Sequence, residues 1–305
     1  MILPAANPWR AATPARLALG RAGVSVPTDE SLHFGLAHAL ARDAVHAGLD
    51  VDALDAALQS RGWRTARARS EAGDRATYLR RPDLGRRLAA LDPPPDGGTG
   101  TGSGSGTDAT GTGDNTGPGA GAFTTPAPHS AWTAPACDLC FVVADGLSAL
   151  AAQRHAVPLL DAVRGMLPTT LSIGPVVIAT QARVALGDDI GERLRAGIVA
   201  VLIGERPGLS APDSLGVYLT HAPRRGRTDA ERNCVSNIRP QGLRYEAAAA
   251  RLAWLIGAAR SLGVSGVSLK DLSDGDAPDA IGAAGAQAPA DTTPRGREPP
   301  PLRGR

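Results

Sequence analysis

The sequence predicts an α/β fold built on a parallel sheet, and two observations carry this prediction. Short, uninterrupted apolar runs recur between residues 139 and 220, and segments with the apolar spacing of helices separate or follow them. Strands that are buried on both faces show such runs, and their alternation with helices is typical of parallel sheets. The hydrophobic content of 43% is enough for a sizeable core. We therefore expect a Rossmann-like domain in this part of the chain.

The individual elements follow from the same pattern. The expected strands are 139–144, 175–180, 198–203 and 215–220. The expected helices are 157–167 (opened by Pro158), 188–195 and the long amphipathic segment 245–262. In open α/β sheets ligands bind beyond the carboxyl ends of the strands. The loops that follow the strands are therefore the first candidates for a functional site.

Residues 1–91 are expected to form a helical region. Thr28 is placed to cap a helix whose first turn is acidic and whose leucines recur at helical spacing. Further helices are expected at 51–58 and from Pro82 to Leu91, with the proline in its favoured first position. Because these helices are short and rich in arginine, they are poorly suited to form a large core alone. We expect them to act as an arm that docks on a partner.

Composition separates two further segments from the patterned ones. Within residues 97–121, 17 of 25 positions are Gly or Thr, and residues 271–305 are rich in Pro, Ala, Asp and Gly. Such segments bury too little apolar surface to offset their ordering entropy, so both are expected to be disordered. The predicted organisation is a helical region (1–91), a linker (92–135), a Rossmann-like domain (136–270) and a tail (271–305).

Charge and cysteine content narrow the classes of function. The net charge is +2 and Lys270 is the only lysine, which argues against a nucleic-acid footprint. Three cysteines in 305 residues do not make a disulfide framework, which favours a reducing compartment. The first residues lack the basic head and apolar core of a secretory signal, and no apolar run approaches the about 20 residues that span a bilayer. We expect a cytoplasmic protein that binds neither nucleic acid nor membrane.

Three loops follow predicted strands and could bind a ligand. They are 145–148, 181–187 and 204–208, and each has residues that form tight turns or let a ligand approach the backbone closely. Glu205 and Arg206 add a carboxylate and a guanidinium to the last loop. The alternative is that the glycines only shape a turn and Glu205 pairs with a neighbouring cation.

The cysteines suggest other chemistry. Cys137 and Cys140 form a C-x-x-C, but residues three apart in a strand point to opposite faces, so we favour buried apolar cysteines over a redox or metal site. Cys234 lies in a polar stretch that we expect to be a long connection, and such connections are often functional. A hydrolase with Cys234 or Ser148 as nucleophile stays open, with His221 as the histidine nearest to Cys234 in sequence.

Four motifs, in order along the chain, resemble the small subunit of adenosylcobalamin-dependent ethanolamine ammonia-lyases. They are TPARLALGRAG (13–23), RVALGDDIG (183–191), IGERPGL (203–209) and ERNCVSNI (231–238). The resemblance covers about residues 7–91 and 136–270. It implies that a large subunit with a TIM-barrel fold joins this chain in a hetero-oligomer that converts ethanolamine to acetaldehyde and ammonia by radical chemistry.

The resemblance also implies the site. The large subunit would hold the substrate and most catalytic groups, and this chain, for which we name no catalytic residue, would cover the adenosylcobalamin from the other side and complete the site. By motif match the cofactor contacts are Val184, Glu205 and Cys234. Arg183 is a further candidate, because a guanidinium can donate several hydrogen bonds to amides or a phosphate.

The chain departs from the family pattern in the 92–135 insert and the Pro/Ala-rich tail. Some relatives carry an N-terminal extension associated with packaging into bacterial microcompartments, so a location inside one stays open. The alternative function is a stand-alone cobalamin- or nucleotide-binding module without lyase activity.

Overall fold

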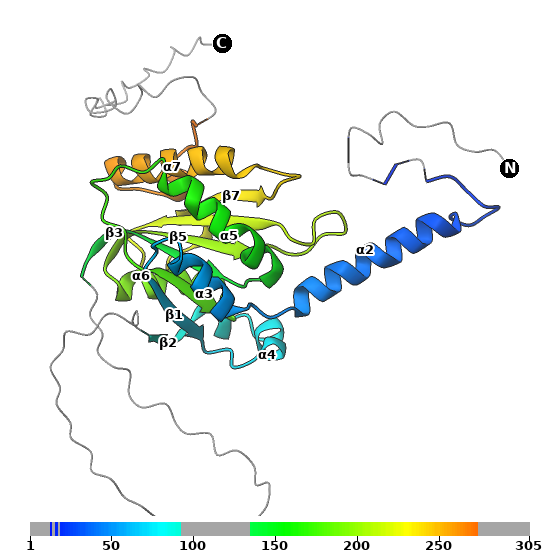
Figure 1. Ribbon diagram of the computed structural model, residues 1–305, viewed down its shortest axis with the longest axis horizontal. Helices are drawn as coiled ribbons and strands as arrows, with labels where there is room; N and C mark the ends of the chain where they lie inside the picture. Colours follow the sequence, from blue (N-terminus) through cyan, green and yellow to red (C-terminus); the bar gives the residue numbers. More distant parts are fainter. Residues whose placement is uncertain (1–12, 14–15, 18, 93–134, 274–305) are drawn as a thin grey trace, which may run out of the picture.

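A computed structural model describes residues 13, 16–17, 19–92 and 135–273, and it confirms the α/β fold (Figure 1). Within these residues, seven strands form one sheet in the order β2-β1-β4-β3-β5-β6-β7. The strands are β1 (Thr65–Ser70), β2 (Leu88–Asp92), β3 (Cys137–Ala144), β4 (Val176–Thr180), β5 (Ala196–Gly204), β6 (Leu215–His221) and β7 (Arg232–Ile238). The helices are α2 (Thr28–His46), α3 (Val51–Gln59), α4 (Arg75–Arg80), α5 (Ala149–Arg164), α6 (Leu186–Arg193) and α7 (Tyr245–Leu262), with 3-10 turns η1 (Leu84–Arg86), η2 (Asp229–Glu231) and η3 (Gly266–Ser268).

The sheet is mixed rather than parallel throughout. The three central pairs, β1 with β4, β4 with β3 and β3 with β5, are parallel. The expectation was wrong for β6, which runs antiparallel to β5 with Val201 opposite Tyr218. The reason is the connection: residues 205–214 contain no helix, whereas a parallel neighbour needs a crossover of about a dozen residues or more.

The secondary structure expected for residues 1–91 was incomplete. The helix predicted from Pro82 to Leu91 is wrong: η1 occupies its middle, and β2 pairs antiparallel with β1 over its second half. In β1, buried alanines alternate with exposed arginines, a period-two pattern that packs one face of a half-buried strand. Because β1 also pairs with β4, strands from both sides of the 92–135 segment share one sheet. That segment lies almost entirely outside the described residues.

Helices cover both faces of the central sheet. Helices α3, α5 and α7 pack on one face, where Phe141 joins the larger apolar core, and α6 packs on the other, where Val142 joins the smaller one. The bounds of α7 agree with the prediction. Helix α5 begins earlier than predicted, because the Ser148 hydroxyl accepts a hydrogen bond from the N–H of Ala151 and caps it, while Pro158 lies inside the helix.

Helix α2 extends away from the sheet (Figure 1). Its N-cap residue is Pro27 rather than the predicted Thr28, and no side chain caps it. Ala44 is its only buried residue, and four large apolar side chains are between 49% and 69% exposed. They are Leu32, Phe34, Leu36 and Leu40. In the described part of the chain, no helix has both the length and the hydrophobicity that crossing a bilayer requires.

Candidate functional site

The ends of β3 and β4 are joined by a buried carboxylate. Asp145 follows β3 and accepts hydrogen bonds from the backbone N–H groups of Gly146 (2.9 Å), Gln181 (2.8 Å) and Ala182 (2.9 Å). Burial raises the pKa of Asp145, although these donors and Arg75, 3.7 Å away, act in the opposite direction. The carboxylate therefore fixes the 181–187 loop, which carries two of the predicted contacts, relative to the turn after β3.

The end of β5 lies directly against the same turn. The N–H of Leu147 donates to the carbonyl oxygen of Gly204 at 2.9 Å. A Cβ added at Gly204 would lie 1.9 Å from the carbonyl oxygen of Ser148, so only glycine fits between the two backbones. This close approach places Glu205, the next residue, at the carboxyl ends of the central strands, beside the 181–187 loop.

Arg183 lies on an aromatic platform that the sequence did not indicate. Its guanidinium carbon is 4.2 Å from the ring centroid of the fully buried Tyr78, and its Nη2 donates to the Tyr78 carbonyl oxygen at 3.3 Å. Burial raises the pKa of Tyr78 to about 12, so the phenol stays protonated and donates to the carbonyl oxygen of Ala182. Arg183 Nε is buried and has no hydrogen-bond partner within the part of the chain that the structure describes. The side chain is thus held in place with one donor left over.

The Glu205 carboxylate is held by neutral donors. The Ser214 hydroxyl donates to Glu205 Oε2 at 2.5 Å, and the N–H of Asn237 donates to the same oxygen at 3.4 Å. Gly216 lies directly beneath, where a Cβ would approach Glu205 Oε1 to 2.7 Å. The carboxylate is therefore fixed by the start of β6 and by β7, no cation among the described residues pairs with it, and it is free to accept hydrogen bonds from a ligand.

Cys234 lies on a strand, not on the long connection that we expected. It stands opposite Tyr218 on the edge strand β7 and is exposed. Although the residue as a whole is exposed, partial desolvation of its sulfur raises the pKa of the thiol, the negative charge of Glu205 acts in the same direction, and a hydrogen bond with Tyr218 opposes them. A raised thiol pKa disfavours a nucleophilic role. Ser148 does not suit that role either, because its hydroxyl is buried and donates to the carbonyl oxygen of Pro212.

Two cavities meet at the predicted contacts. The first, of about 410 Å³, is lined by Arg183, Val184 and Glu205 together with Tyr78 and Tyr218. The second, of about 650 Å³, shares Arg183 and Val184 with the first, so these two residues form the ridge between the cavities. The structure thus brings three of the four predicted residues to one cavity, and it places Cys234 beside that cavity through its cross-strand neighbour Tyr218.

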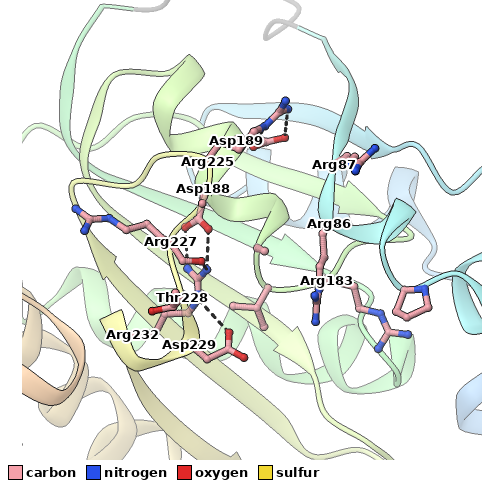
Figure 2. Close-up of a pocket in the computed structure, with 14 residues that line it drawn as sticks. Arg86, Arg87, Arg183, Asp188, Asp189, Arg225, Arg227, Thr228, Asp229 and Arg232 are labelled. Atoms are coloured by element: carbon pink, nitrogen blue, oxygen red, sulfur yellow. Dashed lines mark hydrogen bonds and ion pairs between the residues drawn. The ribbon is translucent and has the colours of Figure 1, made fainter.

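The second cavity, which sequence patterns did not predict, is rich in charge (Figure 2). It is lined by six arginines and three aspartates, which come from η1 and the residue after it, the loop after β4, α6, the loop before η2, η2 and β7. Arg232 and Asp188 form a buried bidentate pair, with two N–O distances of 2.7 Å, and Arg225 pairs with Asp189 at 2.7 Å. These pairs connect α6 to the antiparallel edge of the sheet.

The fold and these cavities define an α/β protein with a broad, polar hollow at the carboxyl ends of its parallel strands. Residues 5–92 and 127–270 match the model of the family described as ethanolamine ammonia-lyase light chain (EutC), and the chain belongs to that family. The match omits residues 93–126, which fall within the predicted insert.

Individual relatives place the chain in the same family. The chain is 49% identical over 269 residues to the ethanolamine ammonia-lyase small subunit of Azotobacter vinelandii, covering 87% of this chain and 88% of the relative. It is 48% identical over 272 residues to the protein of the same name from Ralstonia nicotianae, covering 88% and 90%. The family predicted from the four motifs is therefore confirmed.

Proposed function

We propose that this chain acts with a large subunit to convert ethanolamine to acetaldehyde and ammonia. The observation that carries the proposal is the family match, which spans nearly all the described residues. The name that the relatives share, small subunit, supports a partner of larger size. We propose that this partner is a TIM barrel, that it holds the substrate and that α2 docks on it. The complex is expected in the cytoplasm or inside a bacterial microcompartment.

We further propose that adenosylcobalamin binds across the ridge formed by Arg183 and Val184. The polar groups suit a broad ring fringed with amides: the Glu205 carboxylate accepts from amide N–H groups, and the Arg183 guanidinium, which lines the same cavity, donates to amide oxygens. Val184 offers an apolar contact on the ridge, and Cys234 stands opposite Tyr218, which lines the first cavity. When bound, the cofactor supplies the radical that starts the reaction.

The residues of this chain would bind and position the cofactor rather than take part in bond breaking. Glu205 is already held by Ser214 and the Asn237 N–H, so little side-chain entropy remains to be lost on binding. Arg183 is likewise fixed on Tyr78. A preorganised surface of this kind also keeps water from the covered side of the cofactor.

Ammonia release from ethanolamine in the presence of adenosylcobalamin tests the subunit role. The samples are this chain alone, a large subunit alone, and both together. Activity only in the mixture is expected. Activity in this chain alone would reject the subunit role, and a chain that binds the cofactor but activates no large subunit would support the stand-alone binding module.

Glu205→Ala tests the cofactor site. It should weaken retention of adenosylcobalamin by the complex while leaving the folding of the chain nearly unchanged, because Glu205 is only partly buried. Glu246→Ala is the matched control, since it removes the same charge from the exposed first turn of α7. Equal retention in the two variants would remove Glu205 from the site.

A further inference from the structure

We infer that the second cavity is a subsite for a phosphate group, with Arg86 as its main contact and Arg183 as its second. This inference rests on the proposed function, because the phosphate it assigns is the phosphodiester in the nucleotide tail of a cobalamin. It adds Arg86, which the motifs did not indicate, and assigns the cavity to one group of the cofactor.

The charges in the cavity do not balance. Each aspartate that lines it has an arginine partner, and the pairs with their shortest N–O distances are Asp188–Arg232 (2.7 Å), Asp189–Arg225 (2.7 Å) and Asp229–Arg232 (3.5 Å). Arg227 pairs with Glu231, and Arg87 lies 3.8 Å from Glu71. Among the described residues, no carboxylate lies within 4.0 Å of the Arg86 or Arg183 guanidinium. Within that part of the chain, Arg86 and Arg183 therefore lack a carboxylate partner, and since Arg232 is shared by two aspartates, the six arginines face five carboxylates, which leaves an excess of one positive charge.

The two arginines are held close together by the backbone. The N–H of Arg183 donates to the carbonyl oxygen of Gly85 at 2.8 Å, which ties η1 to the loop after β4. Gly85 is buried, and a Cβ there would come within 3.0 Å of Arg183 Cγ, so the two segments pack tightly. Figure 2 shows the Arg86 and Arg183 side chains extending from one side of the cavity, with Arg232 and Asp229 on the other.

The arginine side chains, rather than the start of α6, supply the donors for an anion. The first N–H groups of α6 already donate to the carbonyl oxygens of the three residues before the helix, and its first turn is acidic. A planar guanidinium matches two phosphate oxygens at once, which suits the exposed Arg86.

Continuity between the cavities indicates which phosphate is bound. Arg183 and Val184 line both cavities, so a large ligand that contacts Glu205 in the first can extend across the ridge into the second. A cobalamin carries one negatively charged group on an otherwise amide-rich molecule, namely the phosphodiester of its tail. Free phosphate shares the same chemistry and is the other source to be distinguished.

The test compares three probes on the complex of both subunits. Adenosylcobalamin carries the phosphate and the lower base, adenosylcobinamide phosphate carries the phosphate without the base, and adenosylcobinamide carries neither. Arg86→Gln should weaken binding of the first two about tenfold and leave the third unchanged, as expected for the loss of one charge-assisted hydrogen bond. Arg80→Gln, on α4 outside the cavity, is the matched control and should change none of the three.

Each other outcome has a definite meaning. An equal loss for all three probes, or no loss for any, would overturn the phosphate subsite. If the wild-type complex bound none of the three, the proposed cofactor role would fail separately. Binding of inorganic phosphate that depends on Arg86 would then assign the cavity to free phosphate, and its absence would overturn the anion site as well.

Discussion

Replacement of Arg232 by methionine should destabilise the protein more than any other single change at the charged cavity. The Arg232 and Asp188 side chains are each 2% exposed and form two hydrogen bonds of 2.7 Å. Arg232 also donates to the Thr220 hydroxyl at 2.9 Å and to the carbonyl oxygen of Arg227 at 3.0 Å. One guanidinium therefore joins β7, β6, α6 and the loop before η2.

The magnitude follows from the burial of the pair. Removing one partner of a buried ion pair leaves the other charge in the interior, which costs about 3–5 kcal/mol. For a folded region of this size, a loss of that magnitude lowers the melting temperature by about 6–20 °C. Removing both charges avoids this penalty, so Arg232→Met combined with Asp188→Leu should recover more than half of the loss.

The assay is urea unfolding of the wild type, both single variants and the double variant, followed by far-UV circular dichroism. Burial already raises the pKa of Asp188, and Arg232 lowers it, so removing Arg232 raises the pKa further. A raised carboxyl pKa destabilises the folded state fully above that pKa and not at all well below the ordinary value. The loss in Arg232→Met should therefore be smaller at about pH 5 than at about pH 8. A double variant as unstable as the sum of the single variants would refute the reasoning.

Two further predictions concern other parts of the molecule. Burial between α5 and α7 lowers the pKa of His155, which contacts Tyr245 at 2.8 Å and Asp213 at 3.5 Å. The unfolded chain therefore binds the proton more tightly than the folded one, and the free energy of unfolding falls as the pH drops below about 6.5. His155→Gln removes the titrating group, so the melting temperature of this variant should depend less on pH in that range. An unchanged slope would contradict the assignment to His155. On α2, Leu36→Asp with Leu40→Asp should abolish co-elution with a large subunit while leaving the melting temperature of the chain within about 2 °C of wild type, because both side chains are at least half exposed. Intact co-elution of that variant would show that α2 is not the docking arm.

The sequence predicted the elements that have a clear local hydrophobic pattern. Strands β3, β4 and β5 are continuous apolar runs, and α7 has a long amphipathic pattern, so local residues determine both their type and their approximate bounds. Strands β1, β2 and β7 lie toward the two edges of the sheet, and their polar or alanine-rich sequences become strands only through pairing with neighbours. The direction of β6 depended on the length of a connection rather than on the strand itself.

The candidate site also contains residues that the sequence could predict and residues that it could not. The loops after the strands, and with them Val184 and Glu205, follow from the general location of ligands in α/β sheets. Tyr78, which holds Arg183, lies 105 residues before it, and Ser214, which holds Glu205, lies across the connection between β5 and β6. No local pattern marks such supporting residues, because their role arises only when the fold brings α4 and the start of β6 beside the loops that follow β4 and β5.

Strands from both sides of the 92–135 segment belong to one sheet, and this has a consequence for how the length of that segment can vary. Asp92, at the end of β2, and Cys137, at the start of β3, are both anchored by hydrogen-bonded strands, so the chain between them begins and ends at fixed points. The entropy of closing such a connection grows only with the logarithm of its length, about 0.6 kcal/mol for each doubling. Lineages can therefore lengthen or shorten this connection, as the residues 93–126 outside the family match suggest, with little penalty to folding. An insertion of one residue within β3 would instead shift every following side chain to the opposite face of the sheet.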